Sequence, residues 1–181
     1  MESLKGKHVL VAGATGGIGS AIVKLLTGSG AIVFITGRNT EKLNALATAN
    51  NIPAERVFVA ELSDETKLHS IAGNIHAMIP QLDILINAAG IGIIKPLENL
   101  TINDFLNTIN SNLVGTFLLV KTFLPKMKEA KKGLIINIPG VLGKVPMAGA
   151  AAYCASKYGL LGMMQCIREE IKRTDIRITN I

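Results

Sequence analysis

Short apolar runs alternate with longer amphipathic stretches along the whole chain. The short runs are nearly continuous in Val, Ile and Leu, which is typical of strands buried on both faces of a parallel sheet. The longer stretches carry helix-forming residues whose apolar positions recur every three and four residues, which predicts helices. The pattern predicts strands at 8–12, 31–36, 56–60, 82–87, 134–138 and 176–181, and helices at 18–27, 40–49, 65–79, 101–128 and 151–173.

The regular alternation of strands and helices predicts the fold class. Strand-helix-strand units imply right-handed crossovers and a doubly wound parallel α/β sheet. The chain has 181 residues, 49% of them hydrophobic, which is enough for one core, so we expect a single domain over residues 1–181. Ligands bind at the carboxyl ends of the strands in such sheets, so the segments 88–100 and 133–152 should flank a site. In the alternative interpretation they are ordinary connections.

Composition excludes several classes of protein. Every apolar run is broken well short of the ~18 residues that a spanning helix needs, so we expect no membrane segment. The N-terminal residues lack the pattern of a secretory signal, which favours a cytoplasmic protein. Cys154 and Cys166 would lie about 18 Å apart along one helix, too far for a disulfide. No pattern of metal-ligand residues stands out, and we predict no metal site.

The net charge of +6 results from 19 Lys and Arg against 13 Asp and Glu. Basic residues gather at Lys121, Lys126, Lys128, Lys131 and Lys132. Aromatic side chains that could stack on bases form only 4% of the chain, so we expect no nucleic-acid partner. We interpret the lysines as solvated helix ends, with a surface for a partner or an anionic ligand as the alternative.

A glycine-rich turn, GATGGIG at 13–19, follows the first predicted strand and opens directly into the first predicted helix. Glycine permits the tight turn and lets the backbone approach a pyrophosphate, while the helix N-terminus offers free N–H groups to anionic oxygens. This context indicates an NAD(P)-binding Rossmann domain rather than a merely structural turn. The predicted cofactor contacts in the turn are Gly13, Thr15, Gly17, Ile18 and Gly19.

The end of the second predicted strand indicates which dinucleotide is preferred. Sites that select NAD normally carry an acidic residue there for the ribose hydroxyls. The chain has TGRN at 36–39 instead. Because the Arg38 guanidinium can hold a 2′-phosphate through paired hydrogen bonds and no carboxylate repels it, the sequence favours NADP, with NAD as the alternative cofactor. Arg38 as a solvated residue at a helix start is the other interpretation.

Four segments together resemble the short-chain dehydrogenase/reductase family, from residue 7 to the end. The turn glycines resemble the family's glycine motif, and the segment NAAG at 87–90 is similar to its Asn-Asn-Ala-Gly segment. Asn112 resembles the active-site asparagine, and Tyr153 with Lys157 resembles the Tyr-x-x-x-Lys pair. The resemblance implies an NAD(P)-dependent oxidoreductase that interconverts a carbonyl and an alcohol on a small molecule.

The resemblance also implies roles for individual residues and an assembly. It assigns Asn112 to a water in a proton relay and Lys157 to the nicotinamide ribose. The helices at 101–128 and 151–173 would pack against symmetry mates in a homodimer or homotetramer. Further cofactor contacts are implied for Glu61, Leu62, Asn87, Ala88, Gly90, Tyr153 and Lys157.

The tyrosine and lysine also form a chemically sensible pair without the family. Four residues apart on a helix, their side chains share a face. An ammonium beside a phenol stabilises the phenolate, so we expect Lys157 to lower the pKa of Tyr153 from ~10 toward the working pH. Tyr153 would then act as general acid for carbonyl reduction or as base for alcohol oxidation. The hydride transfer itself belongs to the nicotinamide.

Two departures from the family pattern leave a second hypothesis open. The family usually has a serine thirteen residues before the tyrosine, where this chain has Gly140, and 133–152 contains no Ser or Thr. Loss of one oxyanion donor typically lowers the rate by ~10²–10³. The chain is also short relative to the family, since it ends at Ile181 after the sixth predicted strand. The alternative is a non-catalytic dinucleotide-binding protein that serves as a sensor or subunit.

Overall fold

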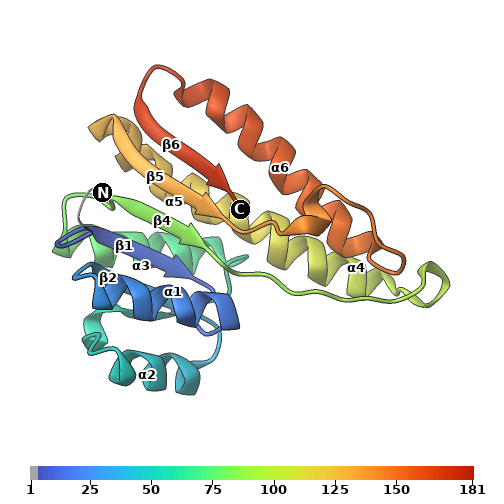
Figure 1. The fold of residues 1–181 in the computed structure, drawn as a ribbon, viewed down its shortest axis with the longest axis horizontal. Coiled ribbons are helices and arrows are strands. Elements are labelled where there is room, and N and C mark those ends of the chain that lie inside the picture. The colour runs from blue at the N-terminus through green and yellow to red at the C-terminus, as the bar shows by residue number, and fades with distance from the viewer. Residues whose placement is uncertain (1–3) are drawn as a thin grey trace.

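The computed structural model describes residues 4–181, which form one parallel sheet with helices on both faces (Figure 1). The strand order is β3-β2-β1-β4-β5-β6. The strands are β1 His8–Ala12, β2 Ile32–Gly37, β3 Val57–Val59, β4 Ile84–Asn87, β5 Lys132–Asn137 and β6 Asp175–Asn180. The helices are α1 Gly17–Gly28, α2 Thr40–Ala49, α3 Glu65–Met78, α4 Ile102–Ile109, α5 Gly115–Ala130 and α6 Ala151–Ile171. The predicted doubly wound sheet is confirmed.

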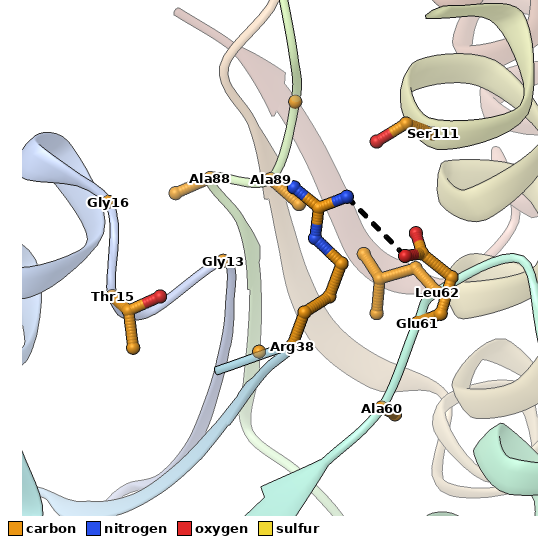
Figure 2. A pocket seen from close by; sticks show the side chains of 12 residues that line it. Gly13, Thr15, Gly16, Arg38, Ala60, Glu61, Leu62, Ala88, Ala89 and Ser111 are labelled. Carbon is orange, nitrogen blue, oxygen red and sulfur yellow. Dashed lines mark hydrogen bonds and ion pairs between the residues drawn. The ribbon is translucent and has the colours of Figure 1, made fainter. Parts of the chain in front are cut away.

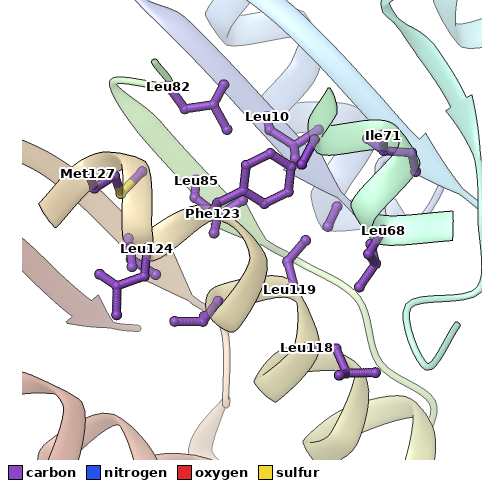
Figure 3. Packing of buried hydrophobic residues seen from close by; sticks show 14 of the residues in the cluster. Leu10, Leu68, Ile71, Leu82, Leu85, Leu118, Leu119, Phe123, Leu124 and Met127 are labelled. Carbon is purple, nitrogen blue, oxygen red and sulfur yellow. The ribbon is translucent and has the colours of Figure 1, made fainter. Parts of the chain in front are cut away.

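Strand β1 shows why the apolar runs of the sequence do not alternate with polar residues. Successive side chains of a strand point to opposite faces. Val9 and Val11 face a cluster completed by α1 and α2, whereas Leu10 and Ala12 face a cluster completed by α3, α5 and α6. Figure 3 shows Phe123 of α5 packed over Leu10 in the second cluster. Both faces of the strand are therefore buried, and the strand ends are held rigidly for a site.

The helix predicted at 101–128 is divided, which corrects that prediction. It begins with α4, where Thr101 and Asp104 form a capping box. A π-helical turn, Asn110–Val114, separates α4 from α5. A π turn inserts one residue into the helical register and is often found at functional sites. The apolar spacing of the sequence gives no sign of this insertion. The other predicted bounds differ from the observed ones by no more than two residues.

The clustered lysines lie on the surface, and both cysteines lie on one helix. Three of the clustered lysines are exposed and form ion pairs: Lys121 with Glu65, Lys126 with Glu129, and Lys128 with Glu170. Cys154 and Cys166 are both free and lie on α6. Within residues 4–181, no helix has the length and apolar character needed to cross a membrane.

His76 on α3 is a polar residue in an apolar setting. Its ring lies 6.1 Å from the ring of Phe123 on α5, measured between centroids. Both ring nitrogens are buried and have no hydrogen-bond partner among residues 4–181. Burial, assisted by the charge of Lys126, lowers the pKa of His76 below its ordinary value of 6.5. The folded protein therefore favours the neutral imidazole.

This lowered pKa predicts a loss of stability in mild acid. Below about pH 6.5 the unfolded chain binds a proton at residue 76 more readily than the folded chain does. The free energy of unfolding therefore decreases as the pH is lowered. We expect His76→Phe to reduce the loss between pH 7.5 and 5.5, measured by urea unfolding. His69→Phe, at an exposed position on the same helix, is the control. An unchanged pH dependence in His76→Phe would contradict this origin.

Candidate active site

Two adjoining cavities lie at the carboxyl ends of the strands. The first, of about 180 Å³, is drawn in Figure 2 and extends from the glycine turn to the ends of β2, β3 and β4. The second, of about 480 Å³, lies beside Tyr153 and Lys157. Both are lined by Ala88, Ala89 and Gly90, in the segment after β4. One cleft therefore joins the predicted cofactor turn to the predicted catalytic pair.

Two glycines of the turn are packed too closely for side chains. A Cβ on Gly13, whose φ is +73°, would lie 2.5 Å from the backbone nitrogen of Ala89. A Cβ on Gly19 would overlap the carbonyl oxygen of Gly13. At Gly17, by contrast, a Cβ would meet no atom within 4 Å. The turn therefore presents bare backbone to open space at the start of α1.

The start of α1 is suited to an anionic group. Asn39 and Asp64 cap α2 and α3 with their side chains, whereas no side chain caps α1. The first turn of α1 also carries no acidic residue. Free N–H groups at a helix N-terminus bind phosphate oxygens. Together with the open space at Gly17, these features fit the pyrophosphate of a dinucleotide.

Arg38 extends across the first cavity from the end of β2 (Figure 2). Its Nη1 lies 3.4 Å from Oε2 of Glu61, and both side chains are about half exposed. Such an exposed ion pair contributes little to stability. The guanidinium is therefore available to a stronger anionic partner. Leu62 follows Glu61 in the same wall.

The predicted cofactor residues are distributed unevenly over the two cavities. Ile18 lines the second cavity, and Gly17 and Gly19 line neither. The first cavity is also lined by residues that sequence reasoning missed: Gly16, Gly37, Ala60, Ala89 and Ser111. Four of them adjoin predicted positions in the turn or at strand ends, which is the signal that could have found them. Ser111 lies on the π turn, and nothing in the sequence pointed to it.

Asn87 lies behind the cleft wall. It is 2% exposed, and its Nδ2 donates to Oγ1 of Thr116 at 2.7 Å. Its Oδ1 accepts from the backbone N–H of Ala89 at 3.1 Å. The Thr116 hydroxyl donates in turn to the carbonyl of Asn112 at 2.6 Å. Asn87 therefore connects the segment after β4 to α5, and it lines neither cavity.

Asn112 joins three parts of the chain. Its Oδ1 accepts from the backbone N–H of Ile91 at 2.8 Å, and its Nδ2 donates to the carbonyl of Ile91 at 2.9 Å. The same Nδ2 donates to Oγ of Ser156 on α6 at 3.0 Å. Ser156 donates to the carbonyl of Tyr153 at 2.7 Å. Ser156 is fully buried and was not singled out from the sequence. Its position beside Lys157 was the available signal.

Tyr153 and Lys157 meet in the second cavity. The Nζ of Lys157 lies 5.4 Å from the centroid of the Tyr153 ring and donates to the carbonyl of Ile138 at 3.3 Å. A Cβ on Gly90 would lie 3.2 Å from both this Nζ and Oδ1 of Asn112. A Cβ on Gly92 would lie 3.6 Å from two ring atoms of Tyr153. The three side chains predicted to be catalytic therefore lie along the segment 90–92.

The predicted effect of Lys157 on the tyrosine is wrong in this structure. Burial raises the pKa of Tyr153 above its ordinary value of 10.0, and the neighbouring Cys154 adds to the rise. Burial also lowers the pKa of Lys157 below 10.5. Loss of solvent disfavours both charged forms. The ammonium faces the ring, and this placement does not offset the burial of the phenol.

Gly140 occupies the position where the family resemblance implies a serine. Its φ of +72° and ψ of 176° belong to a region that only glycine adopts readily. A Cβ there would meet no atom within 4 Å. Its N–H donates to the carbonyl of Ile181 at 3.2 Å. The absence of a side chain is thus matched by a backbone that disfavours one.

Comparisons with known proteins agree on one family. A family model described as short chain dehydrogenase matches residues 7–181. The D-threitol dehydrogenase of Mycolicibacterium smegmatis is 33% identical over 180 residues, 98% of this chain and 69% of that protein. The 3-oxoacyl-(acyl-carrier-protein) reductase FabG of Rickettsia felis is 35% identical and is covered to 73% by the whole of this chain. A crystal structure of a metagenomic short-chain oxidoreductase in complex with NADP has a TM-score of 0.90 and 35% identity, with 99% of this chain and 81% of that chain covered.

Proposed function

Since the chain belongs to the short-chain dehydrogenase/reductase family and is an oxidoreductase of that family, we propose that it interconverts a carbonyl and an alcohol with NADP(H). Tyr153 is the general acid in reduction and the general base in oxidation. The observation that carries this proposal is the arrangement of Lys157 and Asn112 beside Gly90 and of Tyr153 beside Gly92, in a cleft continuous with the glycine turn.

The nicotinamide supplies the hydride when the dinucleotide is bound. The chain's own residues hold the cofactor and move the proton. Because burial raises the pKa of Tyr153, its hydroxyl keeps its proton at neutral pH and can donate it to a carbonyl oxygen. Lys157 is fixed by the carbonyl of Ile138 and would hold a ribose hydroxyl of the cofactor. Asn112 holds Ile91 and, through Ser156, the backbone of Tyr153.

The preference for NADP rests on Arg38. Its guanidinium lies in the first cavity and is paired only with the exposed carboxylate of Glu61 among the described residues. A doubly charged 2′-phosphate is a stronger partner than this carboxylate. The solved relative that binds NADP is consistent with the preference.

We expect NADPH to bind more tightly than NADH, and Arg38→Ala to reduce that preference by tenfold or more. A charge-assisted pair contributes about 1.5–3 kcal/mol, which corresponds to this factor. Fluorescence titration of both cofactors gives the two dissociation constants. Glu61→Gln is the matched control, because it frees the guanidinium and should keep or strengthen NADPH binding. Equal affinities of the unaltered chain for the two cofactors would contradict the role of Arg38.

A second candidate function is a dinucleotide-binding sensor or subunit without turnover. The specific observation in its favour is Gly140, because the second cavity then offers a carbonyl oxygen only one side-chain hydroxyl, that of Tyr153. Cofactor binding without reduction of any carbonyl would select this candidate. Both candidates use the same glycine turn and Arg38.

Replacement of Gly140 by serine measures how much the missing hydroxyl limits the rate. One oxyanion donor raises kcat by roughly a hundredfold, whereas the backbone at this position costs a serine about 1–3 kcal/mol in stability. We expect Gly140→Ser to have a lower Tm and, where folded, a higher kcat with NADPH and a reactive diketone. Tyr153→Phe in that background should abolish the reaction. A folded Gly140→Ser protein that binds NADPH and gains no rate would show that this hydroxyl is not limiting.

The exposed apolar residues of α4 and α5 support a homodimer or homotetramer. Ile102, Leu106 and Phe117 are 69%, 46% and 45% exposed. A closed two-fold contact buries such a patch twice. The proposed small-molecule site lies at the strand ends, so the chain can bind a substrate while these helices contact another subunit.

We expect Phe117→Asp to shift the chain to monomers in analytical ultracentrifugation at micromolar concentration, because a carboxylate would be buried in the contact. Leu25→Asp, on α1 at a position that is 71% exposed, is the control and should leave the assembly unchanged. If the unaltered chain sediments only as a monomer at that concentration, the assembly proposal fails.

A further inference from the structure

The second cavity is apolar around its tyrosine. Large side chains enter it from three separate parts of the chain: the start of α1, the segment after β4, and the segment after β5. Its volume of about 480 Å³ lies in the range of small-molecule sites, ~300–1,000 Å³. We call it the apolar cavity. The large apolar side chains that line it are Ile18, Ile91, Ile94, Ile138, Leu142 and Met147.

The apolar cavity offers few polar side chains to a substrate. Among the described residues that line it, only Tyr153 and Lys157 have polar side chains. The Nζ of Lys157 donates to the carbonyl of Ile138. Asn112, which lies nearby, uses both atoms of its amide on Ile91 and Ser156. A substrate hydroxyl beyond the reacting one would therefore have no free side-chain partner here.

The cavity also lacks a counter-ion for a charged substrate. Lys157 is the single cation among its described lining residues, and the proposed function uses it at the cofactor. Lys95, just beyond Ile94, is paired with Asp104 at 2.7 Å between Nζ and Oδ2. A carboxylate or phosphate next to the reacting carbonyl would thus be buried among aliphatic groups without a partner.

We propose that the substrate is an uncharged, mainly apolar ketone, or the corresponding secondary alcohol, whose reacting oxygen is the group that the site recognises. This inference rests on the proposed function and specifies its substrate class. In the reduction, the carbonyl carbon accepts a hydride from NADPH, which leaves as NADP⁺, and the carbonyl oxygen accepts the proton of the Tyr153 hydroxyl. The tyrosine regains a proton from solvent. The aliphatic remainder of the substrate fills the apolar cavity.

The proposal predicts a large discrimination against hydroxylated substrates. Butan-2-one and 1,3,4-trihydroxybutan-2-one share one carbon skeleton and differ in three hydroxyls. An apolar pocket rejects an added hydroxyl by about ten- to a hundredfold. We expect kcat/KM with NADPH to be at least a hundredfold higher for butan-2-one. It should rise further for hexan-2-one, and 4-oxopentanoate should be a far poorer substrate than pentan-2-one.

A variant tests whether the selectivity between the two ketones arises in the apolar cavity. Leu142→Asn introduces an amide among the lining residues and should narrow the ratio between butan-2-one and its trihydroxy analogue. Val141→Asn is the matched control, because Val141 is 70% exposed and does not line the apolar cavity. It should leave the ratio unchanged. A ratio near one in the unaltered chain, or a preference for the trihydroxy or charged ketone, overturns the proposed substrate class while the proposed function stands.

A binding measurement separates failure of the substrate class from failure of the function. If NADPH binds and no ketone is reduced, the proposed function is overturned. Ligand-observed NMR in the presence of NADP⁺ then compares butan-2-ol with threitol. Tighter binding of butan-2-ol upholds an apolar ligand class for the cavity, and equal or reversed affinities overturn it.

Discussion

The hydrogen bonds of Asn112 hold the cleft together. Its side-chain amide forms hydrogen bonds with the backbone N–H and carbonyl of Ile91 and with Ser156 on α6. Its backbone carbonyl accepts a hydrogen bond from Thr116. The side chains of Asn112, Ser156 and Thr116 are buried, where an unsatisfied polar group is costly and a satisfied one defines a unique arrangement. The π turn brings Asn112 to this junction. Asn112 and its neighbours therefore fix three parts of the chain relative to one another: the segment after β4, the helix α5 and the backbone of Tyr153.

Burial sets the electrostatics of the cleft. Lys157 is 2% exposed, and its ammonium lies over the Tyr153 ring. In this placement the ammonium does not fully stabilise a phenolate at Tyr153. Desolvation keeps the phenol protonated and makes the ammonium easier to discharge. Loss of solvent therefore disfavours the charged form of both groups.

The apolar cavity and Gly140 both limit the number of hydrogen-bond donors beside Tyr153. The wall beside Tyr153 is aliphatic, and the backbone at Gly140 adopts a conformation that disfavours a side chain. A carbonyl placed there is surrounded by hydrocarbon and receives one hydroxyl. Such a site binds apolar molecules well and stabilises an oxyanion weakly. Affinity and selectivity would then come from shape and desolvation, and the rate from a single proton donor.

The sequence by itself determined the fold and ten of the 22 residues that line the two cavities. Continuous apolar runs specify a sheet buried on both faces, and glycines at a strand-to-helix turn specify where the backbone must approach its neighbours, because both depend on local chemistry. Only the tertiary structure decided the rest. The π turn at Asn112, the hydrogen bond from Asn112 to Ser156, 44 residues away, and the burial that raises the pKa of Tyr153 could not be derived from the local pattern. Hydrogen-bond geometry and solvent exclusion at a side chain are fixed by what packs against it, and local spacing carries no record of those neighbours.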